Sequence, residues 1–370
     1  MKNFAQLGVH EDLIKRLDEM GIVEPTPVQE QAIPFLIEEG ADFICQAQTG
    51  TGKTAAFGLP MLQKIKPEKT HVQTLILAPT RELGKQIAKQ LFKFTKHYHR
   101  IFIEAVYGGD PIDIQVKALS RPTHIVVATP GRLLDLLKLG AIDLSKISTV
   151  ILDEADEMIS LGFRKDLEAI FDQVRGRRRT WLFSATMQKN LRELIKEYLA
   201  NNAKFVQLDK KNVVNKLIDH RFVVCRSDDK VYAISKFIQS QGEARGVVFC
   251  RMRSDVVNFA KKLEDEGCAI GAIQGDLSQH EREKIMRGFR NGRIQILVAT
   301  DVAARGIDIE GLAYVAHQSL PDQVEYYTHR SGRTGRAGNS GVSVVFITSK
   351  EMSGIRKLEA RLGITFNQLA

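Results

Sequence analysis

A glycine-bearing loop with a single lysine is the first segment of the sequence whose residue types can do chemistry. The loop runs from Ala47 to Thr54, between an apolar stretch that ends at Cys45 and a run of helix-favouring residues. That order of strand, loop and helix start is typical of a phosphate-binding P-loop. Glycine lets backbone N–H groups close on a phosphate, Lys53 can reach the β and γ phosphates, and the Thr54 hydroxyl can ligate Mg²⁺. We assign nucleotide binding to Gln48, Thr49, Gly50, Thr51, Gly52, Lys53 and Thr54.

An acidic pair at the end of a second apolar run supplies the groups that such a loop lacks. Asp153 and Glu154 directly follow the apolar residues 150–152. Asp153 can hold Mg²⁺ while Glu154 polarises the attacking water. A strand that merely enters a solvated loop would look the same in isolation. The presence of Lys53 and Thr54 elsewhere in the chain favours the catalytic interpretation.

The elements that must position these residues follow an alternating pattern. Short β-branched runs alternate with helical stretches, which predicts an α/β fold of parallel sheets covered by helices on both faces. A polar, basic segment at 209–216 interrupts the pattern and predicts a linker between two units, residues 1–208 and 217–370. The predicted strands are 42–45, 74–78, 101–107, 124–128, 149–152, 180–183, 204–208, 220–225, 246–250, 269–273, 294–299, 313–317 and 342–347.

Composition excludes several other classes of protein. Of the 370 residues, 44% are hydrophobic and 26% are charged, so wholesale disorder, a coiled coil and a fibrous repeat are not expected. No apolar run approaches the length of a membrane span and the start has no export signal, which predicts a cytoplasmic protein. The net charge of +9 permits a polyanionic partner, although ordinary solubility explains it equally well.

The four cysteines do not form a recognisable framework. Cys45, Cys225, Cys250 and Cys268 are far apart, with no CxxC pair and no histidine at metal-ligand spacing. We therefore expect reduced core thiols and no zinc site.

The tetrad Asp153-Glu154-Ala155-Asp156 resembles the motif of the DEAD-box ATP-dependent RNA helicases of bacterial type, in helicase superfamily two. The resemblance extends from Phe4 to about residue 338, and it implies two tandem RecA-like domains: an ATP-binding domain over 1–208 and a helicase domain over 217–370. It also implies ATP and Mg²⁺ as cofactors, hydrolysis of ATP on RNA binding, and local separation of RNA duplexes or remodelling of RNA–protein complexes. The implied partners are RNA and proteins of RNA processing, ribosome assembly or RNA decay, with no membrane.

The resemblance also assigns roles to residues outside the phosphate site. Gln29 would recognise the adenine edge and Phe4 would stack on the ring, and an amide can both donate to and accept from the N6 and N7 positions of adenine. Residues that follow several predicted strands would hold the RNA backbone, which implies little sequence specificity. These residues are Pro79, Thr80, Arg81, Gly108, Gly109, Thr129, Gly131 and Arg132 in the first domain, and Arg251, Gln279 and Thr300 in the second.

Other positions would couple hydrolysis to RNA remodelling, again by resemblance. Ser184 and Thr186 match the motif that links ATP hydrolysis to strand separation. His329 would meet Asp156 across the two domains, and Asp308 would face the ribose.

Two arginines near the end of the match are assigned as arginine fingers. Arg333 and Arg336 are three residues apart, so around a helical turn both can face one way and reach the γ-phosphate across the interdomain cleft. One segment departs from the family, because residues 317–320 read His-Gln-Ser-Leu where relatives carry an Asn-Tyr-Asp-like run.

Two other functions remain open at this point. A non-catalytic, ATP-gated RNA clamp would share the fold, but the full catalytic set disfavours it. A translocating DNA helicase would also share the fold, and the Gln29 segment and the acidic tetrad disfavour that alternative.

Overall fold

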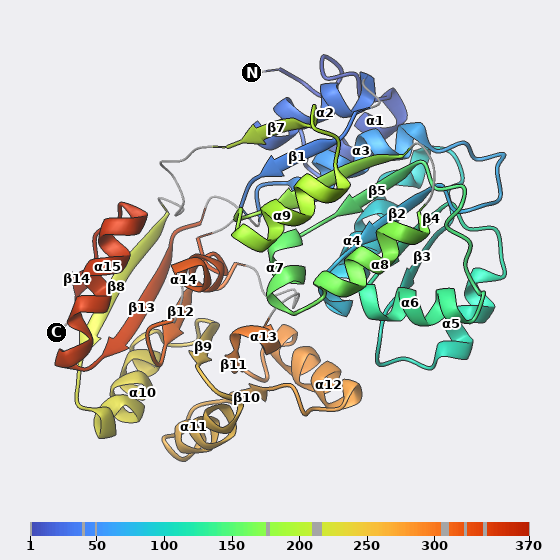
Figure 1. Cartoon of the computed structure of the whole chain (residues 1–370). Coiled ribbons are helices and arrows are strands. Elements are labelled where there is room, and N and C mark those ends of the chain that lie inside the picture. The colour runs from blue at the N-terminus through green and yellow to red at the C-terminus, as the bar shows by residue number, and fades with distance from the viewer. Residues whose placement is uncertain are drawn as a thin grey trace. The chain divides into compact units, whose positions relative to one another are not determined.

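The computed structural model describes residues 2–38, 41–48, 50–174, 178–208, 217–304, 311–321, 324–335 and 339–369 (Figure 1). The chain divides into two compact units, Met1–Leu208 and Asp209–Ala370, called here the N-terminal unit and the C-terminal unit. The predicted linker at 209–216 lies outside the described residues. Within the described ranges, no helix combines the length and the apolar character needed to cross a bilayer.

The N-terminal unit is built on a parallel sheet with the strand order β3-β4-β2-β5-β6-β1-β7. Its strands are β1 (Phe43–Gln46), β2 (Thr74–Leu77), β3 (Ile103–Val106), β4 (Ile125–Ala128), β5 (Thr149–Leu152), β6 (Arg179–Ser184) and β7 (Lys204–Gln207). Its helices are α1 (Glu11–Glu19), α2 (Pro27–Glu38), α3 (Lys53–Lys64), α4 (Arg81–Phe94), α5 (Ile112–Leu119), α6 (Pro130–Lys138), α7 (Ala155–Ser160), α8 (Arg164–Gln173) and α9 (Lys189–Tyr198), with a 3-10 turn η1 (Thr95–His97).

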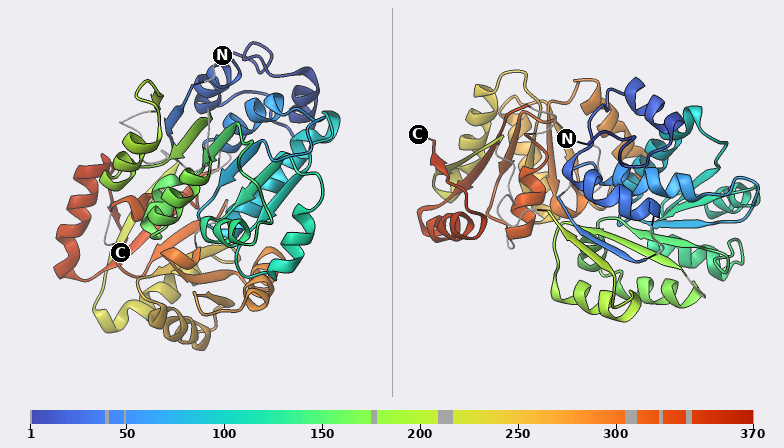
Figure 2. Two further views of the ribbon diagram at one scale, coloured as in Figure 1. Left: turned by 45° about the vertical axis from the view of Figure 1, so that its right-hand side comes forward. Right: turned by 90° about the horizontal axis from the view of Figure 1, so that it is seen from above.

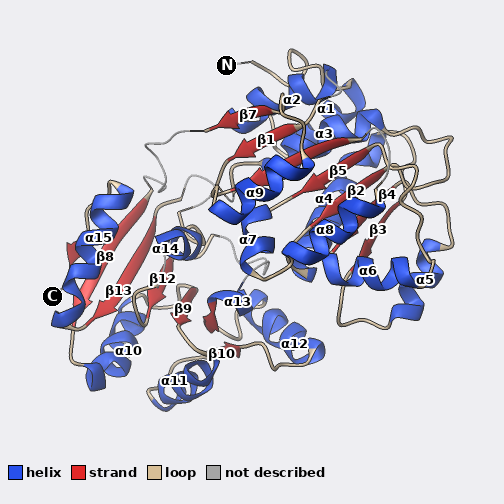
Figure 3. Ribbon diagram, in the orientation of Figure 1, coloured by secondary structure: helices blue, strands red, loops and turns tan. Residues whose placement is uncertain are grey.

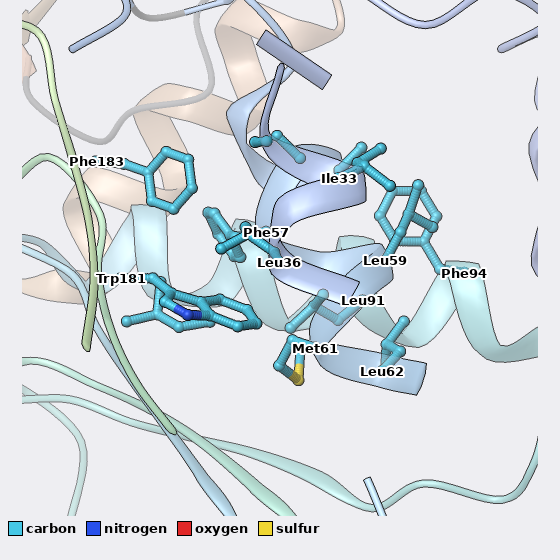
Figure 4. Packing of buried hydrophobic residues seen from close by; sticks show 14 of the residues in the cluster. Ile33, Leu36, Phe57, Leu59, Met61, Leu62, Leu91, Phe94, Trp181 and Phe183 are labelled. Atoms are coloured by element: carbon cyan, nitrogen blue, oxygen red, sulfur yellow. The ribbon is translucent and has the colours of Figure 1, made fainter. Parts of the chain in front are cut away.

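Successive side chains of each strand point to opposite faces of the sheet, so the core of this unit has two layers. Phe43 and Cys45 pack with α1 to α4 on one face of the sheet, whereas Ile44 packs with α6 to α9 on the other (Figure 3). Both faces are therefore covered, which explains why the strands read as continuous apolar runs. Figure 4 shows the first layer, where Trp181 of β6 and Phe57 of α3 are buried among side chains from α2 and α4.

The C-terminal unit repeats this architecture with the strand order β10-β11-β9-β12-β13-β8-β14, all parallel. Its strands are β8 (Ile218–Val224), β9 (Gly246–Cys250), β10 (Ile270–Ile273), β11 (Ile296–Thr300), β12 (Tyr314–His317), β13 (Gly341–Ile347) and β14 (Asn367–Gln368). Its helices are α10 (Lys230–Ser240), α11 (Arg253–Asp265), α12 (Gln279–Arg290), α13 (Asp301–Ala304), α14 (Val324–Ser331) and α15 (Met352–Leu362), with 3-10 turns η2 (Ser227–Asp229) and η3 (Ser349–Glu351).

Residues of β9 show how the second sheet is covered on both sides. Val248 and Cys250 pack with α10 and α11, while Val247 and Phe249 pack with α12. The two further views in Figure 2 show helices flanking both faces of each sheet. Each of the thirteen predicted strands is present, with ends that differ by at most two residues. Strand β14 was not predicted, because two residues are too few to show a period.

Candidate functional site

The phosphate loop connects β1 to α3 in the order that the sequence predicted. Gly50 and Gly52 have left-handed backbones, with φ of 82° and 89°, and the helix begins at Lys53. The Thr51 hydroxyl donates to the Gln48 carbonyl at 2.7 Å, which closes the loop on itself. Only glycine adopts these dihedrals without strain, so the loop conformation depends on both glycines. Thr49 lies outside the described residues.

Lys53 and Asp153 are both buried beyond the carboxyl ends of β1 and β5, which are separated in the sheet by β6. The Lys53 ammonium donates to the Ala47 carbonyl at 3.2 Å, and Asp153 is 3% exposed. Burial raises the pKa of Asp153 to about 6, and the positive charge of Lys53 opposes that rise while Glu154 adds to it. A buried carboxylate with incomplete charge compensation stabilises a cation placed beside it.

The same end of the sheet offers oxygen donors that suit Mg²⁺. The Asp153 carboxylate and the Thr54 hydroxyl are hard ligands of the kind that Mg²⁺ prefers. The described residues contain no group of three or more histidine, cysteine or acidic side chains that could hold a metal ion. Mg²⁺ commonly takes its remaining ligands from water and phosphate oxygens, so two protein donors are enough.

Glu154 has a strained backbone directly after β5. Its φ and ψ are both 51°, and it is the one non-glycine residue with a left-handed backbone in the described part of the chain. Its N–H donates to Asp153 Oδ1 at 3.0 Å, and its carboxylate does not cap α7, which begins at the next residue. Such strain costs roughly 1–3 kcal/mol and is concentrated at functional sites. The turn leaves the Glu154 carboxylate available for chemistry.

The last acid of the tetrad lies in a hydrogen-bonded network with the end of β6. Asp156 Oδ2 accepts from both the backbone N–H and the hydroxyl of Thr186, each at 2.8 Å. The Asp156 N–H donates to the Ser184 hydroxyl at 3.3 Å, and that hydroxyl donates to the Thr186 carbonyl at 2.7 Å. The structure thus brings together three residues that the sequence assigned to coupling.

Gln29 connects the segment before the P-loop to the P-loop itself. Its side chain is 3% exposed, accepts from the Thr26 N–H at 2.9 Å and donates to the Gly52 carbonyl at 3.1 Å. One amide hydrogen and one carbonyl lone pair remain for another partner. Phe4 is 2% exposed and packs in the first core layer, so its stacking on adenine stays a prediction.

The predicted RNA contacts of the N-terminal unit follow the carboxyl ends of β2, β3 and β4. Pro79 and Thr80 follow β2, Gly108 and Gly109 follow β3, Thr129 follows β4, and Gly131 and Arg132 lie in the first turn of α6. The Thr80 hydroxyl caps α4 by accepting from the Leu83 N–H at 3.3 Å.

Asp110 contacts two of the arginines that were predicted to bind RNA. Arg81 forms an ion pair with the Asp110 carboxylate at 2.6 Å, and Arg132 donates to the Asp110 carbonyl at 3.0 Å. The Arg81 guanidinium also lies 4.6 Å from the centre of the Tyr107 ring. Asp110 and Tyr107 were not predicted: the sequence indicated that these loops share one edge of the sheet, but not which side chains contact one another there.

The predicted RNA contacts of the C-terminal unit lie at the ends of β9 and β11 and at the start of α12, which follows β10. Arg251 follows β9 and is exposed. Thr300 ends β11, and its hydroxyl accepts from the Ala303 N–H at 3.2 Å, while Arg282 donates to the Ala303 carbonyl at 2.5 Å. Gln279 is the first residue of α12.

The helical-turn argument for the two arginine fingers is wrong. Helix α14 includes His329 but ends at Ser331. Thr334 then forms an isolated parallel β-bridge with Leu312. Arg333 therefore lies in a turn after the helix, one residue before Thr334. Arg336 and Asp308 lie outside the described residues.

The sequence did not predict a buried polar network that includes Tyr327 and Arg330 of α14. Arg330 makes a two-pronged ion pair with Asp301, at 2.5 and 2.6 Å, and its guanidinium also lies 3.4 Å from His317 Nδ1. His317 reaches Tyr327 through the Ser343 hydroxyl, with bonds of 3.0 and 3.2 Å. Burial holds the pKa of His317 well below its usual range. The departure from the family at His317 thus belongs to a network that includes the arginine-rich motif.

Comparisons with known proteins agree with this geometry. Residues 26–194 match the family model described as DEAD/DEAH box helicase, and residues 229–338 match the one described as Helicase conserved C-terminal domain. The fold and site therefore define a two-unit helicase. More particularly, the chain belongs to the DEAD-box ATP-dependent RNA helicases.

Relatives in two bacteria carry that name. The chain is 43% identical over 356 residues to the DEAD-box ATP-dependent RNA helicase CshA of Streptococcus pneumoniae, which covers 96% of this chain and 67% of the relative. It is 41% identical over 359 residues to the ATP-dependent RNA helicase CshA of Listeria monocytogenes, which covers 97% of this chain and 68% of the relative.

Solved structures with bound ligands have the same fold. Saccharomyces cerevisiae Dbp5 bound to RNA and ADP BeF3 matches with a TM-score of 0.89 and 29% identity, over 100% of this chain and 96% of that one. Mss116p bound to single-stranded RNA and AMP-PNP matches with a TM-score of 0.88 and 28% identity, over 99% and 78% of the two chains.

Proposed function

We propose that this chain hydrolyses ATP when RNA is bound, and that it uses the cycle to separate short RNA duplexes or to remodel RNA–protein complexes. The observation that carries the proposal is the meeting of the P-loop lysine Lys53 with the acidic pair Asp153 and Glu154 at one end of the N-terminal sheet. The names of the relatives and the ligands of the matching structures point to the same reaction.

The nucleotide is held by groups of known position in the N-terminal unit. Lys53 contacts the β and γ phosphates, and N–H groups of the loop at the start of α3 close around them. Gln29 uses its remaining donor and acceptor on adenine, and Phe4 stacks on the ring. Because the Gln29 side chain already bonds the Gly52 carbonyl, adenine recognition and P-loop conformation are linked through one amide.

Mg²⁺ fits the donor set of Asp153 and Thr54. When bound, the ion would neutralise the phosphate charge that shifts in the transition state. Glu154 orients the attacking water and accepts its proton. Arg333 and Arg336 supply the cationic groups that stabilise charge on the γ-phosphate, with Asp308 on the ribose.

RNA is held along its backbone by loops at the carboxyl ends of strands in both units. Parallel sheets bind ligands at that edge, and side chains aimed at phosphate and sugar carry little sequence information. The ion pair of Arg81 with Asp110 keeps the guanidinium oriented before RNA arrives.

Coupling passes through the network of Asp156, Ser184 and Thr186. If His329 binds Asp156 only when both ligands are present, RNA raises ATPase competence and ATP raises RNA affinity by the same factor.

We also infer a cytoplasmic location, since the four cysteines are free thiols that suit a reducing compartment. We further infer partners among RNA-processing, ribosome-assembly or RNA-decay proteins.

An ATPase assay with RNA, with DNA and with no nucleic acid, at one stated salt concentration, tests the proposal. We expect phosphate release to rise with RNA. Glu154→Gln should bind ATP nearly as well as the parent but stop turnover. A lack of phosphate release under all conditions would favour the ATP-gated clamp, and stimulation by duplex DNA alone would favour the DNA helicase.

A further inference from the structure

A pocket in the N-terminal unit lies at the edge of the sheet opposite the P-loop. Its volume is about 490 Å³, and its wall includes Gln73, Ser148 and Arg179. Gln73 and Ser148 directly precede β2 and β5, and Arg179 is the first residue of β6. Residues Thr74, Thr149 and Arg179 are in register across these three strands. The P-loop and the acidic tetrad follow the carboxyl ends of the strands, so the pocket shares no residue with the site described above.

The charge of this pocket is entirely positive. Among the residues that the structure describes, no aspartate or glutamate lines it, whereas Lys64, Lys66, Lys69, His71, Lys146 and Arg179 all do. Apart from Lys64, which donates to the Ile37 carbonyl at 2.6 Å, none of these side chains has an ion-pair or hydrogen-bond partner among the residues that the structure describes. Six basic side chains therefore line one pocket, and no described carboxylate forms an ion pair with any of them.

Two acids lie near these lysines in the sequence: Glu68, next to Lys69, is exposed and does not line the pocket, and Asp143 is engaged elsewhere. Asp143 accepts from the Ser145 N–H at 2.8 Å and from the Ser145 hydroxyl at 2.9 Å, one bond to each carboxylate oxygen. These bonds, together with the charges of Lys146 and His71, lower the pKa of Asp143. The positive charges of the basic cluster thus act on Asp143, although Asp143 does not line the pocket.

The cations repel one another in the absence of an anion. Burial lowers the pKa of Lys64, and the positive charge of Arg179 lowers it further. An arrangement that brings like charges together costs free energy unless a ligand of opposite charge compensates. This electrostatic cost and the concave shape point to the same kind of ligand.

Hydrogen bonds hold the walls of the pocket in place. Gln73 is 5% exposed; its side chain accepts from the Lys66 N–H at 2.9 Å and donates to the carbonyls of Lys66 and Lys69, at 2.8 and 3.2 Å. The Ser148 N–H and hydroxyl both donate to the Gln73 carbonyl, and the Arg179 N–H donates to the Ser148 carbonyl. The basic loop and the strand ends therefore form one connected frame, which lowers the cost of ordering on binding.

We propose that this pocket binds a compact polyanion that carries several phosphate groups, of the inorganic oligophosphate class. Its volume lies within the range of small-molecule sites. No phenylalanine, tyrosine or tryptophan of the described ranges lines it, so those residues offer no platform for stacking a nucleobase, which RNA-binding grooves commonly use. A pocket of this size also suits a short anion better than an extended backbone.

Calorimetric titration with inorganic tripolyphosphate tests this assignment, at an ionic strength of about 0.15 M. All titrations use the full chain with Lys53→Ala, because the P-loop would otherwise bind the same probe. In that background, Lys69→Ala with Lys146→Ala removes two exposed pocket lysines whose side chains form no hydrogen bond or ion pair with another described residue. Lys117→Ala with Lys138→Ala removes the same charge from exposed positions on α5 and α6, away from the pocket.

We expect the pocket variant to bind tripolyphosphate about tenfold or more weakly, because one charge-assisted contact is worth a factor of that order. The control pair should change affinity less than about twofold. Equal affinity in the two variants, or no binding in the Lys53→Ala background, would overturn the proposal. A parallel titration with a single-stranded RNA oligonucleotide tests the ligand class. If the pocket variant loses affinity for RNA but keeps it for tripolyphosphate, the pocket is an RNA contact and the assignment is wrong.

Discussion

Thr186 donates two hydrogen bonds to a single oxygen of Asp156, one from its backbone N–H and one from its hydroxyl, each at 2.8 Å. The other oxygen of that carboxylate is buried and has no hydrogen-bond partner among the described residues. The pair joins the end of β6 to the first turn of α7, so a change at either end of the pair is felt at the other. This makes the pair a place where hydrolysis and RNA remodelling can be separated by mutation.

Thr186→Val tests that separation. The substitution removes the hydroxyl bond but keeps the backbone bond and the side-chain volume. We expect RNA-stimulated ATP hydrolysis to change less than about threefold and duplex separation to fall about tenfold, because a bond to a charged acceptor is worth roughly 1.5 kcal/mol or more. Both rates are measured on one protein preparation. Thr186→Ser keeps the hydroxyl and should retain both activities, and an equal loss of both rates in Thr186→Val would contradict a coupling role.

Gly52→Ala tests the link between the P-loop and Gln29. A Cβ at residue 52 would lie 2.4 Å from the Gln29 side-chain nitrogen, and the backbone φ is 89°. We expect affinity for a fluorescent ATP analogue to fall about tenfold or more, since left-handed strain alone costs roughly 1–2 kcal/mol. Gly21→Ala is the matched control, because Gly21 has a φ of 73° and no neighbour within 4 Å of an added Cβ. Parental affinity in Gly52→Ala would exclude the close packing of these two segments as a determinant of binding.

Arg330→Gln tests the buried ion pair with Asp301. Arg330 bonds both carboxylate oxygens, so its removal leaves a charge in a poorly hydrated site, and the free energy of unfolding should fall by about 3–5 kcal/mol. Urea denaturation followed by circular dichroism measures this. Arg356→Gln breaks an exposed pair with Glu359 and should cost less than about 1 kcal/mol.

A second substitution separates the ion pair from other effects of losing Arg330. Asp301→Asn in the Arg330→Gln background removes the unpaired charge and should recover part of the lost stability. If the double variant is as unstable as the sum of the single variants, the two residues do not stabilise each other.

The sequence alone predicted the sheets and the phosphate site because their signals are local. A β-branched run identifies a strand wherever it lies, and Lys53 with its glycines is a contiguous motif. Asp301 and Arg330 are 29 residues apart, and only the packing of α14 beside the end of β11 brings them together. Arg333 shows the opposite error, because helical spacing was assumed for a residue that lies in a turn after the end of α14.

The buried histidine His220 predicts a pH dependence of stability. Its Nδ1 lies 2.5 Å from the Tyr327 hydroxyl, and burial lowers its pKa to about 4, against the small opposing effect of Asp219. Between this pKa and the ordinary value of 6.5 the unfolded chain binds more protons than the folded one, so stability falls as the pH falls through this window. The contribution is fully present above pH 6.5 and is lost toward pH 4.

Urea denaturation at a pH of about 7.5 and of about 5 measures the effect, and His220 should account for roughly 2 kcal/mol of the difference. His220→Gln lowers stability at both pH values, because the variant disturbs the contact with Tyr327, but it should reduce the pH dependence by that amount. His317 lies in the same network with a lowered pKa and keeps part of the dependence in the variant. The exposed His99, replaced by Gln, is the control and should keep the parental difference. A parental pH dependence in His220→Gln would mean that His220 is not the group that charges on unfolding.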